Sequence, residues 1–228
     1  MPLRFRCLPI LGPVPLPDMM TIPKKMLLSP LFQQGGYTIL RNWLTPDFLA
    51  ALAAEARERK ILATGVHISK SDSELVRGGS PARKFLNAPG GDIQRSLYES
   101  RSAMQAVANL AQLPVAPTGS CGTYSYYCRP GDYLTIHRDI ATCDVAVITC
   151  LEEEGIASSG GKLCVYPSRV HESLAQVRRD PTRGALPLRL APGETVVLFG
   201  GLVPHCTLPV VAGQNRVVSL LCYRAIVE

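Results

Sequence analysis

The sequence predicts a mainly β fold with flanking helices, of the sandwich or jelly-roll kind. From Gly119 onward, short apolar runs alternate with turns that contain glycine or proline, which is typical of antiparallel strands. Before that point, apolar residues recur at helical spacing. Hydrophobic residues make up 46% of the 228 residues, enough to bury a full core. We predict a Pro-rich N-terminal arm over 1–35 and a single domain over 36–228, with helical support and a lid in 36–118 and a jelly-roll core in 119–228.

The helical support is predicted to begin with a short strand over 36–40, after a Gly-Gly turn. Thr45, Pro46 and Asp47 then supply a capping residue, a first-turn proline and an early acid, which together indicate the start of a helix. Basic side chains near residue 60 suit the negative end of that helix.

A second helix is predicted over 93–113, and Pro114 ends it. The stretch 61–92 before it is irregular and rich in glycine, serine and proline. Because this stretch is too long for a plain connector, it predicts a lid or binding loop.

Eight short strands are predicted in the core, separated by turns. One interruption, at 168–183, is predicted to be helical or loop-like. The strands are predicted at 121–128, 132–138, 143–151, 161–166, 186–190, 194–200, 205–211 and 215–224.

The protein is predicted to be cytoplasmic, with reduced thiols. Its eight cysteines include no C-x-x-C pair, and several lie in apolar runs such as 147–151, where a cysteine acts as a small buried hydrophobe. Prolines interrupt the apolar stretch 8–16, so an extended arm is predicted there instead of a secretory signal. No apolar run reaches the ~20 residues of a membrane helix.

Two histidines and an aspartate are the most informative residues. His137 and Asp139 lie two apart on a predicted strand, so they project from one face, together with Tyr133 and Thr135 if the strand stays regular. An H-x-D pair alone occurs often by chance. His205 begins another predicted strand and can complete the set. Two imidazoles and one carboxylate can hold one face of a ferrous ion and leave its other positions open.

Arg216 distinguishes between the metals that such a set could bind. It follows His205 on the next predicted strand. An arginine there can take the free carboxylate of a keto-acid cosubstrate in a bidentate pair, which favours iron, whereas a zinc site of this composition would suit hydrolysis. The alternative for Arg216 is an arginine on the surface of a strand.

These residues lie in segments that resemble the Fe(II)- and 2-oxoglutarate-dependent dioxygenases, in the branch similar to prolyl 4-hydroxylase. The resemblance covers the C-terminal part of the chain well and the rest loosely. The similar segments are Tyr127-x-x-Pro130-Gly131-x-Tyr133-x-x-x-His137-x-Asp139, then Gly160-Gly161-Lys162-Leu163, then Pro192-Gly193…Phe199…His205…Pro209-Val210…Gly213…Arg216.

The resemblance implies a double-stranded β-helix, which is a distorted jelly roll. It implies His137, Asp139 and His205 as catalytic residues that bind Fe(II), and Arg216 as the residue that binds the distal carboxylate of 2-oxoglutarate. O2 is the implied second cosubstrate, and ascorbate is left open as an accessory reductant.

Further contacts to the cosubstrate are implied less directly. Tyr127 matches a tyrosine that reaches the cosubstrate pocket, although a core aromatic with a satisfied hydroxyl would fit equally well. Tyr124 and Tyr126 are further candidates, and alternation puts these two on one face.

The chain departs from the family pattern on the strand after H-x-D. Many relatives carry a tyrosine there, whereas this position is Cys150, with Thr149 beside it. Thr149, Ser219 or Thr207 could supply the missing hydroxyl. Ser219 falls on the opposite strand face from Arg216 unless a bulge intervenes.

The resemblance implies hydroxylation of an unactivated C–H bond, with release of succinate and CO2. A small-molecule substrate is predicted, an amino acid or a natural-product intermediate, with no nucleic-acid or membrane partner and a homodimer left open. The predicted lid holds several basic residues that are either solvated loop charges or partners of a carboxylate or phosphate on the substrate. They are Lys70, Arg77, Arg83, Lys84 and Arg95.

Three alternatives stay open. A peptidyl, prolyl-type hydroxylase would need an open groove for its substrate. A nucleic-acid demethylase on the same fold would use a second arginine shortly after the cosubstrate arginine, which Asn215-Arg216…Arg224 does not reproduce. A non-catalytic, cupin-like metal-binding barrel would bind the metal without releasing succinate.

Overall fold

All eight strands predicted for the core form in the computed structural model, which describes residues 24–71, 77, 79–119, 122–155 and 160–226. Most are runs of buried residues between turns, as the apolar pattern predicts, whereas β9 is largely exposed. They are β5 (Thr123–Tyr127), β6 (Tyr133–His137), β7 (Val145–Glu154), β8 (Leu163–Val165), β9 (Leu186–Leu188), β10 (Thr195–Leu198), β11 (His205–Thr207) and β12 (Asn215–Ala225).

Four strands precede this core. The predicted strand at 36–40 is confirmed as β1 (Tyr37–Leu40). The stretch 61–92 was predicted to be irregular throughout, and this is wrong, because β2 (Thr64–Ile68) and β3 (Arg83–Pro89) form within it. Their own sequences carry a weak strand signal, but β3 pairs with β2, β5 and β6, so tertiary pairing decides their conformation. A short β4 (Val115–Pro117) pairs with β12.

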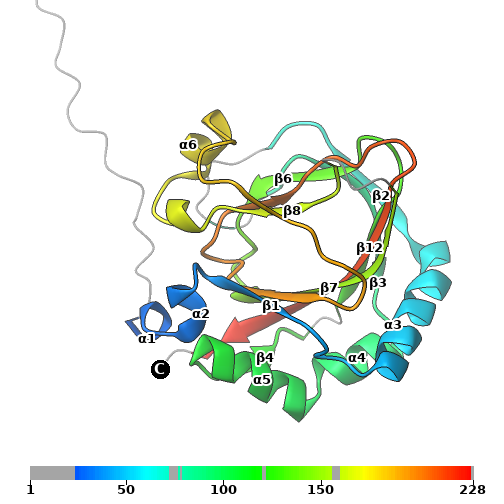
Figure 1. Ribbon diagram of the computed structural model, residues 1–228, viewed down its shortest axis with the longest axis horizontal. Helices are drawn as coiled ribbons and strands as arrows, with labels where there is room; N and C mark the ends of the chain where they lie inside the picture. The colour runs from blue at the N-terminus through cyan, green and yellow to red at the C-terminus, as the bar shows by residue number, and fades with distance from the viewer. Residues whose placement is uncertain (1–23, 72–76, 78, 120–121, 156–159, 227–228) are drawn as a thin grey trace, which may run out of the picture.

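The strands form one curled antiparallel sheet in the order β1-β10-β7-β12-β5-β3-β6-β11-β8-β9. The sheet bends back on itself, so β6 and β8 lie across the interior from β1 and β7 (Figure 1). This is the arrangement of a double-stranded β-helix, the fold class that the sequence predicts.

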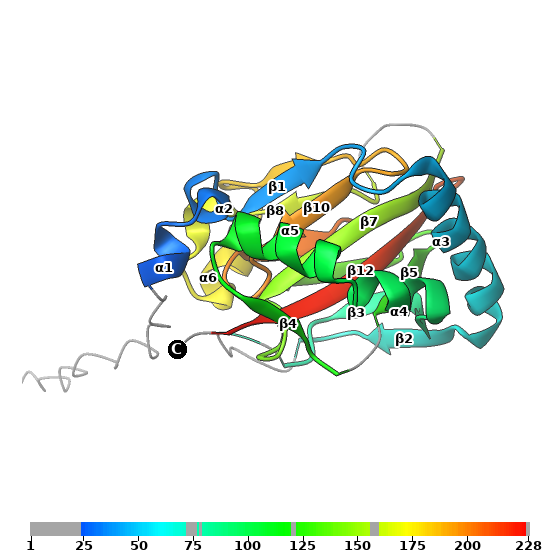
Figure 2. The same ribbon diagram turned by 90° about the horizontal axis from the view of Figure 1, so that it is seen from below.

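Helices cover the outer side of the sheet. The predicted first helix is confirmed as α3 (Pro46–Arg59), with the Thr45 side chain accepting a hydrogen bond from the Phe48 backbone N–H. In Figure 2, α4 (Asp92–Tyr98) and α5 (Arg101–Ala111) lie across β7, β12 and β5. Among the described residues, no helix has the length and apolar character needed to cross a membrane.

The prediction of one continuous helix over 93–113 is wrong, because the helix breaks between α4 and α5. Ser100 caps α5, its side chain accepting a hydrogen bond from the Ala103 backbone N–H. A serine in this role favours a new helix start over continuation. The described end of the predicted N-terminal arm is also helical, as α1 (Lys24–Leu27) and α2 (Pro30–Gln33), whereas residues 1–23 lie outside the described part of the chain.

The predicted interruption at 168–183 contains a short 3-10 helix, η2 (Pro167–Arg169), and α6 (Leu174–Arg179). A small cluster of buried side chains links α6 to the outer faces of β6, β8 and β11, separate from the main core. Its members are Ile136, Cys164, Tyr166, Leu174, Val177 and Cys206. A second 3-10 helix, η1 (Lys60–Leu62), follows α3.

Strand alternation sorts residues between the helix-covered face and the interior. On β12, Val218 and Leu220 line an internal cavity. Ser219, between them, faces outward and accepts a hydrogen bond from the Gln94 side chain of α4 at 2.7 Å. The inner face is therefore free to carry a functional site, while the outer face holds the helices.

Glu55 fastens the helical layer to the sheet from a buried position on α3. Its carboxylate accepts hydrogen bonds from the backbone N–H groups of Gly91 (3.2 Å), Ile93 (2.7 Å) and Gln94 (3.0 Å), and from the Tyr124 hydroxyl. Burial raises the pKa of Glu55, but these hydrogen bonds outweigh it, so the net pKa is lowered. A lowered pKa in the folded state stabilises the fold above the ordinary carboxyl pKa, and this stabilisation is lost as the pH falls.

We expect Glu55→Gln to lower the free energy of unfolding by about 1–3 kcal/mol at neutral pH, because an amide NH2 group then replaces one of the two carboxylate oxygens that accept these buried hydrogen bonds. The difference from the wild type should shrink as the pH falls below the ordinary value of 4.5, since the wild-type carboxyl is then protonated too. Urea denaturation at both pH values measures this. Glu58→Gln, at an exposed position of the same helix, is the control. Equal stability of Glu55→Gln and the wild type at neutral pH would contradict this role.

Candidate metal centre and its cavity

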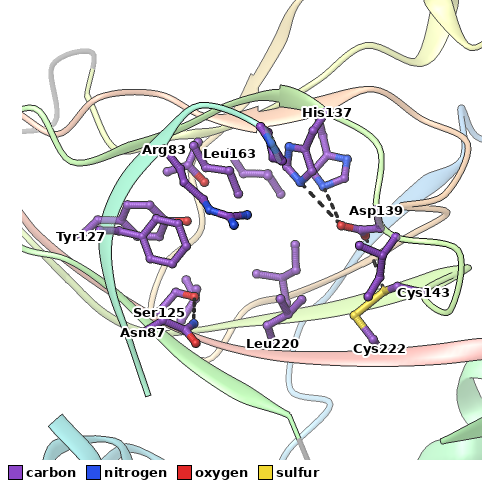
Figure 3. Close-up of a pocket in the computed structure, with 18 of the residues that line it drawn as sticks. Arg83, Asn87, Ser125, Tyr127, His137, Asp139, Cys143, Leu163, Leu220 and Cys222 are labelled. Atoms are coloured by element: carbon purple, nitrogen blue, oxygen red, sulfur yellow. Dashed lines mark hydrogen bonds and ion pairs between the residues drawn. A yellow bond between two sulfur atoms is a disulfide. The ribbon is translucent and has the colours of Figure 1, made fainter. Parts of the chain in front are cut away.

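The three predicted metal ligands converge on one point of the inner face. The Nε2 atoms of His137 and His205 lie 3.6 Å and 3.7 Å from Oδ1 of Asp139. The ligand atoms of all three residues lie within 4.8 Å of one another, a spacing at which they can bind a single ion. Figure 3 shows His137 and Asp139 on one side of the cavity.

The meeting of the two histidines follows from strand pairing. His137 ends β6, His205 begins β11, and the two are direct partners in the antiparallel register. Two residues further along β11, Thr207 pairs with Leu134, so β6 carries one extra residue. This bulge shifts the alternation of β6. The expectation that Tyr133 and Thr135 share the ligand face is therefore corrected, because Leu134 lines the cavity instead.

Backbone carbonyls orient both imidazoles. Nδ1 of His137 donates to the Thr135 carbonyl at 2.9 Å, and Nδ1 of His205 donates to the Val203 carbonyl at 3.0 Å. With the proton on Nδ1, the lone pair of each Nε2 faces the shared point. These contacts fix the ring orientations before any ion arrives.

The protonation states of His205 and Asp139 also favour the binding of a cation. Burial, reinforced by His137, lowers the pKa of His205 to about 4, so this ring is neutral at physiological pH. Burial raises the pKa of Asp139, but His205, His137 and Arg77 outweigh burial, so its net pKa is lowered. An ionised carboxylate and a neutral imidazole need lose no proton to bind a metal. The donor set therefore fits a divalent metal such as Fe(II).

Arg77 holds the loop that carries Asp139. Its guanidinium donates to the carbonyls of Asp139 (3.2 Å), Ile140 (2.7 Å) and Cys143 (2.7 Å), and to Oδ1 of Asp144 (2.7 Å). The sequence places Arg77 only among the basic residues of the predicted lid. No local pattern could assign it this role, because its partners lie more than sixty residues away along the chain.

Gly200 leaves the space that the Asp139 carboxylate occupies. A Cβ atom at this position would overlap the carboxylate, and the Gly200 carbonyl accepts a hydrogen bond from the Asp139 backbone N–H at 2.8 Å. Gly200 lies in a Gly-Gly pair shortly before His205, and its close approach to the metal ligand Asp139 is visible in the tertiary structure alone.

A disulfide joins Cys143 to Cys222 beside the metal centre. Both cysteines line the cavity, and Sγ of Cys143 lies 3.6 Å from Oδ2 of Asp139. The prediction of reduced thiols is therefore wrong for this pair, which strand packing brings together from positions 79 residues apart. The cytoplasmic location stays a prediction and loses this support.

We expect the double replacement Cys143→Ser with Cys222→Ser to lower the free energy of unfolding by roughly 4 kcal/mol, because the bond closes a long loop in the unfolded chain. Denaturation of the wild type and the double variant without reductant measures the difference. Cys128→Ser, which removes a free thiol, is the control. If denatured wild type shows equal numbers of reactive thiols with and without reductant, the disulfide does not exist in the protein.

The triad opens onto a cavity of about 240 Å³. Arg216 of β12, Tyr127 of β5 and Thr207 of β11 also line it. Arg216 is only 2% exposed; one of its terminal nitrogens lies 3.4 Å from Oε2 of Glu153, and its Nε has no hydrogen-bond partner. Burial raises the pKa of Tyr127, although the hydrogen bond with Thr207 opposes the shift. The Tyr127 phenol therefore stays protonated at neutral pH.

Two other predicted tyrosine contacts need correction. Tyr124 and Tyr126 alternate with the cavity-lining residues of β5 and face α3 instead. The Tyr124 hydroxyl donates to Glu55, and the Tyr126 hydroxyl donates to the Ala56 carbonyl at 2.6 Å. These two tyrosines join the helix to the sheet and do not reach the cavity.

Two predicted hydroxyl contacts are corrected for the same reason. Ile148 of β7 lines the cavity, so Thr149 faces outward, where its hydroxyl shares a hydrogen bond with that of Thr195 at 2.9 Å. Ser219 also faces outward and bonds to Gln94, because the residues of β12 that line the cavity alternate without interruption as Arg216, Val218 and Leu220. Of the hydroxyl groups considered beside Arg216, those of Tyr127 and Thr207 line the cavity.

No protein-family model and no curated protein sequence matches the chain. Solved structures match most of it. A prolyl-4-hydroxylase from Pseudomonas putida is 20% identical, with a TM-score of 0.57 over 86% of this chain and 96% of that one. The epimerase SnoN from nogalamycin biosynthesis, solved with Fe3+, alpha ketoglutarate and nogalamycin RO, is 16% identical, with a TM-score of 0.62 over 85% of this chain and 80% of that one.

A third solved structure is a prolyl hydroxylase from Trichoplax adhaerens in complex with a peptide fragment of hypoxia inducible factor. It is 15% identical, with a TM-score of 0.56 over 88% of this chain and 91% of that one. These likenesses establish that the chain has the fold of the 2-oxoglutarate–Fe(II) oxygenases.

Proposed function

We propose that this protein is a non-heme Fe(II)- and 2-oxoglutarate-dependent dioxygenase that hydroxylates an unactivated C–H bond of a small molecule, with release of succinate and CO2. The substrate class that we propose is an amino acid or a natural-product intermediate. The observation that carries the proposal is the convergence of His137, Asp139 and His205 on a cavity that also receives the buried Arg216. The shared fold of known oxygenases adds support.

His137 and His205 would hold the metal through Nε2, and Asp139 through its carboxylate. Two imidazoles and one carboxylate on one side of an ion leave the opposite positions open for small ligands. Fe(II) bound there supplies the activation of O2 that accompanies oxidative decarboxylation of 2-oxoglutarate. The chain contributes the orientation of the ligands, since the carbonyls of Thr135 and Val203 hold both rings.

Arg216 would bind the distal carboxylate of 2-oxoglutarate. A buried guanidinium with an unpartnered Nε retains a donor for a carboxylate, and a charge-assisted bond in a buried site is strong. Glu153 holds one side of the guanidinium and keeps it oriented. The protonated phenol of Tyr127 and the Thr207 hydroxyl can each donate to the same carboxylate.

The cavity walls support a small substrate. Besides the polar groups, most of the lining is apolar, including Phe85, Ile148, Leu163 and Leu220, so water is displaced and a hydrocarbon body can pack. The volume of about 240 Å³ is small beside the roughly 300–1,000 Å³ of sites for drug-sized ligands. A substrate that shares this space with a cosubstrate has few heavy atoms. Its placement would select which C–H bond reacts.

The other predictions remain predictions. They are the location in the cytoplasm, the absence of a nucleic-acid partner, ascorbate as an accessory reductant, and a homodimer as an open alternative to the monomer. The peptidyl alternative keeps one observation in its favour, because one solved structure of this fold holds a peptide.

The test is a screen for coupled decarboxylation. The protein is incubated with Fe(II), 2-oxoglutarate and O2 in the presence of small acids, amino acids, proline-containing peptides or methylated single-stranded DNA, and succinate is measured against product. We expect stoichiometric succinate with a small molecule. Turnover only with peptide or DNA would assign the alternatives, and metal binding without succinate under any condition would leave a metal-binding barrel.

A further inference from the structure

Arg83 presents a guanidinium to the cavity that no described residue neutralises. It begins β3 and lines the cavity, and Figure 3 shows its side chain pointing inward, toward the space between Tyr127 and His137. Its Nε is buried without a hydrogen-bond partner. Within the described part of the chain, neither an ion pair nor a hydrogen bond reaches this guanidinium. A charged group at a cavity wall without a partner costs free energy unless a bound ligand supplies the opposite charge.

The other basic residues of the predicted lid do not share this placement. Arg77 is bound to the loop that carries Asp139. The ammonium group of Lys84 donates a solvent-exposed hydrogen bond to a backbone carbonyl at 3.2 Å. Lys70 and Arg95 are exposed and lie outside the cavity lining. The charges of these four residues are therefore satisfied by solvent or by other protein groups. Of the five basic residues, Arg83 is the one that presents to the cavity a guanidinium without a partner among the residues described.

Arg83 and Arg216 reach the cavity from different places. In the sheet order, β5 separates β3 from β12, so the two backbones lie about 10 Å apart across the sheet. Arg83 also pairs with Leu134 on β6, three residues before the metal ligand His137. Each guanidinium can therefore hold its own oxyanion in the cavity that contains the metal centre.

We propose that Arg83 binds the oxyanion of the primary substrate, a carboxylate or a phosphate, and that the substrate is a small organic acid with an apolar body. This inference rests on the proposed function. The planar guanidinium offers two parallel N–H donors to such a group. Phe85 and Leu134, on the same two strands, line the cavity beside it and can pack the apolar body.

The cavity is poorly suited to the ammonium group of a free amino acid. Among the described residues that line it, Asp139 is the only carboxylate, and the metal would use that group. A buried ammonium without an anionic partner is strongly disfavoured. Within the substrates proposed above, the inference therefore favours an acid that lacks a free amino group.

The first experiment separates the substrate site from the cosubstrate site. Calorimetry measures 2-oxoglutarate binding to the Mn(II)-loaded wild type, Arg83→Gln, Arg216→Gln and Lys84→Gln, where Lys84→Gln matches the charge change at a half-buried position outside the cavity lining. We expect 2-oxoglutarate affinity to fall with Arg216→Gln and to change less than about twofold with Arg83→Gln. If Arg83→Gln weakens it as much as Arg216→Gln does, Arg83 belongs to the cosubstrate site and the proposal is overturned.

The second experiment asks what Arg83 recognises. Ligand-observed NMR compares hexanoate with hexanamide, which has the same apolar body and no charge, on the protein loaded with Mn(II) and 2-oxoglutarate. We expect the wild type and Lys84→Gln to prefer hexanoate by roughly tenfold or more, a preference that Arg83→Gln abolishes and Arg83→Lys retains in part. Absence of this preference in the wild type, or its survival in Arg83→Gln, would overturn the proposal.

Two further ligands identify the source of the oxyanion and test the exclusion of ammonium. Hexyl phosphate replaces hexanoate in one arm, and a stronger preference for it that depends on Arg83 assigns a phosphate. In the other arm, 2-aminohexanoate should bind more weakly than hexanoate, and equal or tighter binding contradicts the exclusion of free amino acids.

If 2-oxoglutarate fails to bind at all, the proposed function fails. The comparison of hexanoate with hexanamide on the metal-free protein still decides whether Arg83 binds acids.

Discussion

Replacing Asp139 with alanine should abolish succinate release and weaken Mn(II) binding by more than about a hundredfold. Loss of a residue that merely supports a metal ligand already costs about 10–100-fold, and Asp139 is the anionic ligand itself. Its carboxylate is the group that His137 and His205 both approach, at 3.6 Å and 3.7 Å. Without it, two imidazoles remain and no charge balances the ion.

Calorimetry with Mn(II) measures the binding effect independently of turnover, and thermal denaturation shows whether the variant is folded. We expect metal-free Asp139→Ala to remain folded, because the backbone hydrogen bond to Gly200 is unaffected. Asp180→Ala removes a carboxylate at an exposed position and serves as the matched control. Unchanged turnover in Asp139→Ala would show that the triad assignment is wrong, and with it the proposed function.

Replacing Arg216 with glutamine should weaken 2-oxoglutarate binding by about 10–100-fold, since a charge-assisted contact in a buried site contributes about 1.5–3 kcal/mol. The effect should depend on the distal carboxylate. Binding of 2-oxopentanoate, which has the same carbon chain without that carboxylate, should be weak in the wild type and unaffected by the replacement. Calorimetry on the Mn(II)-loaded proteins measures both ligands.

Glu153 complicates this test and also supplies its control. Arg216→Gln leaves the buried Glu153 carboxylate without its positively charged partner, which by itself destabilises the fold. We expect the double variant with Glu153→Gln to recover stability in denaturation while still failing to bind 2-oxoglutarate. Recovery of both would mean that Arg216 has a structural role only, and wild-type affinity in Arg216→Gln would exclude the contact to the cosubstrate.

The strand pattern of the core was readable from the sequence because it is local. Most of these strands are short runs of buried residues between turn residues, and the eight predicted runs all form. The same holds for the start of α3, where Thr45 caps the helix through its own side chain. These features depend on neighbours within a few residues.

The failures arose where a distant partner decides the conformation or the orientation. The bulge in β6 depends on the register with β11, and it determines that Leu134 and not Thr135 joins His137 on the inner face. Tyr124 and Tyr126 turn outward because helix α3 offers them acceptors. The disulfide of Cys143 joins residues that are 79 positions apart, and no spacing rule predicts it.

Residue chemistry and short-range periodicity were enough to predict the eight core strands, the candidate ligands His137, Asp139 and His205, and the arginine that could accompany them. The side chains that share the cavity were not predictable in this way. The folded structure distinguishes Arg83, whose guanidinium has no partner in the described ranges, from Arg77, whose guanidinium binds the loop of Asp139. Burial and charge pairing depend on contacts between strands far apart in the chain, and those contacts exist only once the sheet has curled.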